Sequence, residues 1–99
     1  MIPEDYKFQT TFMSDFNIAN SFGLDAIQDT YNRAFAEWKN NVDYMKEFVL
    51  ALNWHCWHTY HGNQYEMSKL YSDLYYKAHD YCLDNFKGKE LEDYIKFLD

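Results

Sequence analysis

Large apolar residues recur every three or four positions along most of this chain, and this spacing constrains the fold more than any other feature. Residues three or four apart share one face of an α-helix, so each such stretch predicts a helix with one buried face. The clearest stripe consists of Ile27, Tyr31, Ala34, Phe35 and Trp38. Three glycines and one proline in 99 residues are too few for the many tight turns of a β architecture. The sequence therefore predicts an all-α protein.

Capping and turn residues divide the chain into a small bundle of four to five helices. Helix N-caps are expected at Ser14 and Asn41, and capping boxes at Asp25 and Asn63. Helices are expected to end at the three glycines, Gly23, Gly62 and Gly88. The predicted helices are 14–22, 25–40, 42–60, 63–86 and 89–98, preceded by an extended arm over residues 1–13. No linker or internal repeat interrupts them, so residues 1–99 are predicted to form a single domain.

The charge balance and the apolar content exclude several classes of protein. Sixteen acidic residues against nine basic ones give a net charge of −7, whereas a direct nucleic-acid binder needs a cationic surface. The N-terminal MIPEDYKF lacks the basic and apolar regions of a secretory signal, and no apolar run approaches the roughly 18 residues that cross a bilayer. We therefore expect a cytoplasmic protein with no membrane association, whose acidic surface either confers solubility or meets a basic protein partner.

The two cysteines predict no catalytic site. Cys56 and Cys82 lie on inward-facing stripes of consecutive helices, so both are expected to be buried, reduced thiols and could be neighbours. Cys56 and His79 offer the residue types of a nucleophile and its base, but nucleophilic cysteine chemistry needs an exposed, readily ionised thiol. The prediction is a protein that is not an enzyme and has no cofactor.

Three histidines, His55, His58 and His61, follow one another at steps of three, which places them on successive helical turns. Imidazoles on neighbouring turns can hold a divalent ion. These three sweep about a third of the helix circumference, which is wide for one tetrahedral ion, and no motif supplies a further ligand. The prediction is no metal site, with His55 at the border of the core and the other two facing solvent or a partner.

The helix predicted over 42–60 is apolar on two faces. One face carries the core stripe through Met45, Phe48 and Leu52, and the other carries Trp54 and Trp57. Such a helix is either enclosed on both sides or commits one face to a partner. Tryptophan is enriched at binding hot spots, so the second face is the first candidate partner-binding site. Its residues are Leu50, Trp54, Trp57, His58 and His61, with Asp43 and Glu47 as flanking charges.

A second candidate surface is the acidic outer face of the helix predicted over 63–86. Its residues are Glu66, Asp73, Asp80 and Asp84, with Lys69 and Lys77 interleaved. The mixed charge is typical of a solvated helix face. Mimicry of a phosphate backbone is the alternative interpretation.

The chain resembles small proteins encoded by bacteriophages and prophages. The resemblance is carried by Asp-Thr-Tyr-Asn-Arg-Ala-Phe-Ala-Glu-Trp-Lys at 29–39 and by Leu-Asn-Trp-His-Cys-Trp at 52–57. It implies an accessory protein of the bacterial host cytoplasm and transfers no catalytic residue. Small acidic phage proteins are often inhibitors of host defence, so we expect a non-enzymatic protein that binds and inhibits a host protein, such as a nuclease-based defence system of the anti-CRISPR or anti-restriction type. The alternative is a structural or assembly protein that forms a homodimer through its aromatic helix face.

Overall fold

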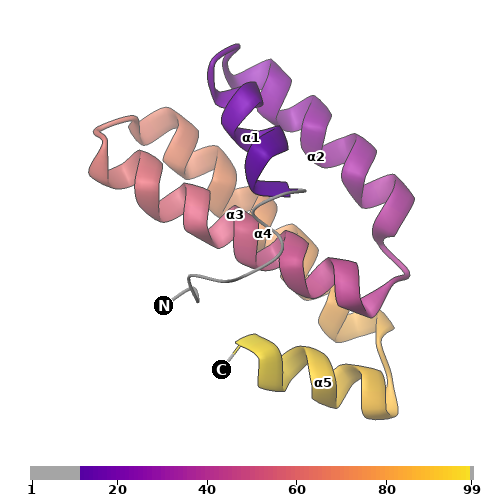
Figure 1. Cartoon of the computed structure of the whole chain (residues 1–99). Coiled ribbons are helices and arrows are strands. Elements are labelled where there is room, and N and C mark those ends of the chain that lie inside the picture. The colour runs from indigo at the N-terminus through magenta and orange to yellow at the C-terminus, as the bar shows by residue number, and fades with distance from the viewer. Residues whose placement is uncertain (1–11, 99) are drawn as a thin grey trace.

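The computed structural model describes residues 12–98, and this part of the chain forms five α-helices joined by short turns (Figure 1). The helices are α1 (Phe12–Asn20), α2 (Leu24–Trp38), α3 (Val42–His61), α4 (Tyr65–Asn85) and α5 (Gly88–Leu98). The predicted all-α bundle of four to five helices is confirmed. No helix in this part of the chain is long and apolar enough to cross a membrane.

The two longest helices, α3 and α4, form an antiparallel pair at the centre of the molecule (Figure 1). α1 and α2 form a second, shorter hairpin, with α1 packed on α3 and α2 packed on α4. α5 turns back beneath the central pair and contacts both of its helices. Each helix therefore buries one face, as the three-and-four spacing requires.

Phe16 of α1 is the centre of the aromatic core. Its side chain is fully buried, and its ring centroid lies 6.1 Å from that of Phe48, 5.7 Å from that of His55 and 5.6 Å from that of Tyr71. These contacts join α1 to both central helices. The buried apolar side chains are Phe16, Ala19, Ile27, Tyr31, Met45, Phe48, Val49, Ala51, Leu52, Tyr71, Leu74, Ala78, Cys82, Phe86 and Tyr94.

Asn20, at the end of α1, connects three helices through polar contacts. Its side-chain oxygen accepts a hydrogen bond from the Tyr71 hydroxyl of α4, and its amide nitrogen lies 3.4 Å from Nδ1 of His55 on α3. Buried polar groups must be hydrogen-bonded to avoid a desolvation penalty. Asn20 meets this need and also fixes the position of α1. His55 is therefore a buried core residue, whereas the sequence placed it at the border of the core.

Tyr94 attaches α5 to the rest of the molecule. It is fully buried, its hydroxyl lies 2.8 Å from Nδ1 of His79, and its ring packs edge-on against Phe86. The hydroxyl also interacts with the thiol of Cys82. Burial raises the pKa of Tyr94 and raises that of Cys82 to about 11, so both groups are neutral at physiological pH.

The predicted helix boundaries are right at Asn41 and Gly62. The side-chain oxygen of Asn41 accepts hydrogen bonds from the backbone N–H groups of Asp43 at 3.1 Å and Tyr44 at 3.2 Å, which caps α3. Gly62 follows the last residue of α3 and donates its N–H to the carbonyl of His58. Hydrogen bonds from residues next to the helix therefore define both ends of α3.

Three predicted N-caps are wrong. α1 begins at Phe12, and Ser14 lies inside it, where its exposed hydroxyl remains hydrated and imposes no helix start. α2 begins at Leu24 after Gly23, whose φ of 106° suits glycine, so Asp25 lies in the first turn. Asn63 has a left-handed backbone conformation, with φ 64°, in the turn between α3 and α4. Its side-chain oxygen accepts a hydrogen bond from the Tyr65 hydroxyl and does not cap α4.

Two further sequence predictions need correction. Gly88 does not end α4, which stops at Asn85. Phe86 then turns into an extended conformation to enter the core, and Gly88 begins α5. The extended arm predicted over 1–13 lies outside the described residues, apart from positions 12 and 13, which belong to α1.

Candidate partner-binding surface

The C-terminal half of α3 and the first residue of α4 present a group of neighbouring rings, most of them exposed. The side chain of Trp57 is 60% exposed, and Tyr60 and Tyr65 are exposed to a similar extent. His58 and His61 are also exposed, whereas Met45, Phe48 and Leu52 bury the opposite face of the same helix. We name this group the aromatic surface, and its members are Trp54, Trp57, His58, Tyr60, His61 and Tyr65.

The rings of the aromatic surface contact one another. His58 stacks on Trp54 with ring centroids 3.6 Å apart and meets Trp57 edge-on at 5.3 Å. The ring of His61 lies 4.1 Å from that of Trp57, and Tyr60 meets Tyr65 at 5.5 Å. Neighbouring rings restrict one another's rotamers, so a partner would immobilise them at a reduced entropic cost.

The two tryptophans differ in their surroundings. Trp54 is half-buried and packs against the core, and its ring meets that of His55 edge-on at 4.9 Å. Trp57, one turn later, is mostly exposed. Leu50 is also half-buried against the core. The second face of α3 is therefore partly core at its centre and free only toward its C-terminal end.

The charged residues of the sequence-based candidate site lie away from the exposed tryptophan. Asp43 is in the first turn of α3 and Glu47 in the second, so the helical rise separates them from Trp57 by about 21 and about 15 Å. Asp43 is exposed and pairs with Lys46 at 3.5 Å, whereas Glu47 is half-buried. The structure thus brings together Trp54, Trp57, His58 and His61, and places Asp43 and Glu47 at the opposite end of the helix.

Tyr60 and Tyr65 were missed as members of this surface. Tyr60 lies three residues after Trp57, a spacing that places both on neighbouring turns of one helix. Tyr65 was assigned to a capping box, and the turn at Asn63 instead turns it back toward Tyr60. The spacing could have identified Tyr60, whereas Tyr65 depends on the geometry of the turn.

His58 of the aromatic surface is biased toward its neutral form. Partial burial lowers the pKa of His58, and the charge of nearby His61 lowers it further. A neutral imidazole can both donate and accept a hydrogen bond, which suits it to a polar rim around Trp57.

The remaining histidines and cysteines do not gather into a reactive site. Cys56 lies 3.7 Å from the Ser68 hydroxyl near the start of α4, whereas His79 contacts Tyr94 about 17 Å further along that helix. Cys82 is further still, so the two cysteines are not neighbours. Cys56 is half-buried rather than buried as predicted, with Ser68 of α4 beside it. Within residues 12–98, no three His, Cys, Asp or Glu side chains are placed to share a metal ion.

The acidic face of α4 is solvated, as predicted. Glu66, Asp73, Asp80 and Asp84 are exposed, and so are the interleaved Lys69 and Lys77. The charge of the face is mixed. Exposed pairs of opposite charge contribute little to binding, so this face is a weaker candidate than the rings of the aromatic surface.

Comparison of the chain with known protein families, with curated proteins and with solved structures finds no match. Function must therefore be inferred from the surfaces of the chain itself.

Proposed function

We propose that this protein is a non-enzymatic binding protein that holds a protein partner against the aromatic surface. The observation that carries the proposal is the 60% exposure of Trp57 among rings that already contact one another. Leaving a tryptophan in water is unfavourable for a monomer, and Trp and Tyr dominate binding hot spots because they bury large areas with little loss of side-chain freedom.

The partner we propose is a host protein that this chain inhibits, specifically a nuclease-based defence protein of the anti-CRISPR or anti-restriction type. Two observations support this choice. The net charge of −7 favours a basic partner, and nucleases carry basic channels for their substrates. The resemblance to phage-encoded proteins at 29–39 and 52–57 supports an accessory role in a bacterial cytoplasm.

A pulldown with matched variants tests the proposal. The full-length tagged protein is incubated with lysate of a bacterium that carries such a system, and captured proteins are identified by mass spectrometry. Trp57→Ala removes the centre of the aromatic surface, and Tyr76→Ala removes a ring that is equally exposed on α4. We expect a nuclease partner to be lost with Trp57→Ala and retained with Tyr76→Ala. Equal capture by both variants would contradict the proposal.

A homodimer formed through the same rings is the second candidate function, and the exposure of Trp57 and Tyr60 favours it equally. In that case the pulldown would recover only the chain itself. Sedimentation equilibrium would then show a dimer that Trp57→Ala dissociates. The net charge of −7 opposes this association, because like charges on two copies repel.

A further inference from the structure

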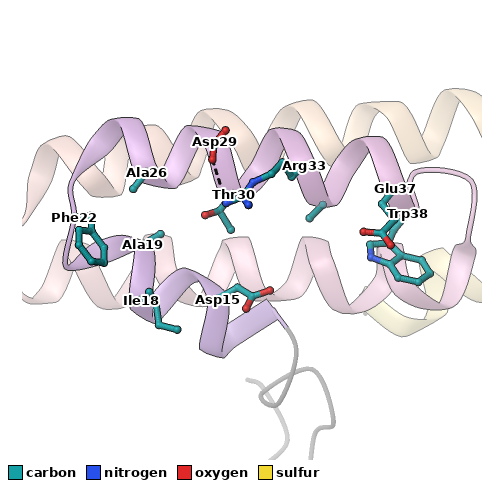
Figure 2. Close-up of a pocket in the computed structure, with 11 residues that line it drawn as sticks. Asp15, Ile18, Ala19, Phe22, Ala26, Asp29, Thr30, Arg33, Glu37 and Trp38 are labelled. Carbon is teal, nitrogen blue, oxygen red and sulfur yellow. Dashed lines mark ion pairs between the residues drawn. The ribbon is translucent and has the colours of Figure 1, made fainter.

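A groove of about 470 Å³ runs between α1 and α2 (Figure 2). Small side chains line its inner part, among them Ala19, Ala26 and Ala34. Phe22 lies at one end and Trp38 at the other (Figure 2). Small residues between two helices let a third segment approach the backbone closely.

The groove exists because the two helices of the hairpin differ in length. α1 has 9 residues and α2 has 15, so α1 runs beside only the first part of its partner. Ala34 and Trp38, which the apolar stripe assigns to the core, are consequently only half-buried and line the groove. The groove shares no residue with the aromatic surface.

Two large apolar side chains stand exposed at the edge of the groove. Ile18, in α1, is 60% exposed. Phe22, in the turn that follows α1, is 79% exposed. Apolar side chains grouped around a concavity are typical of docking sites for an amphipathic segment.

The charges around the groove are predominantly negative. Among the described residues, Asp15, Asp29 and Glu37 line it, and Arg33 is the basic residue of this lining. Arg33 pairs with Asp29 at 3.1 Å (Figure 2), so the carboxylates of Asp15 and Glu37 are left in excess. A segment with basic residues beside its apolar face would complement this rim. A second copy of this chain, with net charge −7, would not.

We propose that the α1–α2 groove docks a basic amphipathic helix of another protein. Its apolar face packs on Ile18, Phe22 and the alanines of the groove, and its lysines and arginines lie along Asp15 and Glu37. From Ala26 to Trp38 α2 rises about 18 Å, which accommodates about three turns of the incoming helix. The protein then has two binding surfaces, and this one functions independently of the aromatic surface.

A designed peptide tests the groove. The probe is a dye-labelled helical peptide of about 18 residues with leucines on one face and lysines on the other, titrated with the full-length protein and followed by fluorescence anisotropy. Ile18→Ser with Phe22→Ser removes the exposed apolar pair. The matched control is Tyr76→Ser with Ile95→Ser, which removes two exposed apolar side chains from α4 and α5. We expect saturable binding that the groove variant weakens at least about ten-fold and the control leaves unchanged.

A charge variant gives a second measurement that does not depend on the apolar pair. Asp15→Asn with Glu37→Gln should weaken binding a few-fold and flatten its dependence on salt between 50 and 300 mM, since exposed charges are screened. Circular dichroism checks that each variant keeps the helical content of the parent protein.

The proposal would be overturned by the absence of saturable binding, or by equal affinity of the groove and control variants. It would equally be overturned by equal affinity for a peptide whose lysines are replaced by glutamates, or by self-association that Ile18→Ser with Phe22→Ser abolishes. Binding that appears only in a full-length Tyr6→Ser, Phe8→Ser variant would also overturn it, because the chain's own first residues would then be the occupant. Loss of binding in Trp57→Ala would assign the peptide to the aromatic surface instead.

Discussion

Trp54 and Trp57 lie one turn apart on α3, and their surroundings predict opposite consequences of truncation. Trp54 is half-buried, packs on the core and stacks with His58, so Trp54→Ala should destabilise the protein by about 2 kcal/mol and lower its melting temperature by roughly 10 °C. Trp57 is exposed, so Trp57→Ala should change stability by less than about 0.5 kcal/mol. Thermal unfolding followed by circular dichroism measures both.

The same pair should separate binding from stability. With a partner in hand, Trp57→Ala should weaken affinity by at least about 2 kcal/mol while the melting temperature stays near that of the parent protein. A melting temperature that falls as far for Trp57→Ala as for Trp54→Ala would show that Trp57 supports the fold and would remove it as the centre of the aromatic surface.

The two cysteines should react at different rates with a thiol reagent. Burial raises the pKa of Cys82 to about 11, so only about one thiol in a thousand is ionised at pH 8, and its side chain is fully enclosed. Cys56 is half-buried at the edge of α3. We expect Ellman's reagent to modify Cys56 at least about ten times faster than Cys82 in the native protein. Cys56→Ser should abolish the fast phase, Cys82→Ala should preserve it, and the reverse pattern would contradict the burial of Cys82.

At the scale of the helix, α1 is anchored by few contacts. Phe16 and Ala19 are its buried apolar side chains among the residues described, and Asn20 adds the polar link to Tyr71 and His55. Asn20→Ala leaves the Tyr71 hydroxyl without this acceptor, which should cost about 1–3 kcal/mol. Hydrogen exchange should show faster exchange of the α1 amides, with α4 amides little changed, because local opening follows the weakest contacts.

A double-mutant cycle distinguishes a lost hydrogen bond from lost packing at Asn20. In a Tyr71→Phe background no hydroxyl remains to be satisfied, so Asn20→Ala should cost less than in the parent protein by about 1 kcal/mol. Equal costs in the two backgrounds would mean that the Tyr71–Asn20 bond contributes nothing to the attachment of α1.

The helices themselves could be predicted from the sequence because apolar spacing is a property of each element alone. The ends were harder to predict. Asn41 caps α3 as expected, but Ser14 and Asp25 do not start their helices. A cap contributes only about 1 kcal/mol, so the packing of Phe16 and Ile27 outweighs it in placing α1 and α2.

The candidate sites depend on packing that the sequence does not specify. Both tryptophans occupy the second face of α3 in the sequence pattern, and only the arrangement of the helices shows that the core covers Trp54 and leaves Trp57 free. The groove beside Ala34 and Trp38 arises from the unequal lengths of α1 and α2. Helix length depends on where α1 begins, and the predicted start at Ser14 falls two residues after the observed one at Phe12.

For the whole molecule, the neutral groups of the core predict sensitivity to alkali. Burial, with a smaller contribution from the nearby Cys82 thiol, raises the pKa of Tyr31 from 10.0 to about 12, and burial raises the pKa of Cys82 from 9.0 to about 11. Burial also raises the pKa values of Tyr71 and Tyr94. Between about pH 9 and 12 the folded chain therefore binds more protons than the unfolded chain, and stability must fall as pH rises.

Urea unfolding at pH 7, 9, 10 and 11 measures this loss. The free energy of unfolding should be nearly constant between pH 7 and 9 and then decline. Each group that is protonated in the folded state and ionised in the unfolded state makes this decline steeper by at most about 1.4 kcal/mol per pH unit. Tyr31→Phe should make the decline shallower because it removes one such group from the core, whereas Tyr76→Phe, at an exposed position, should leave the slope unchanged. A free energy that stays level to pH 11, or equal slopes for the two variants, would show that these hydroxyls ionise without opening the core.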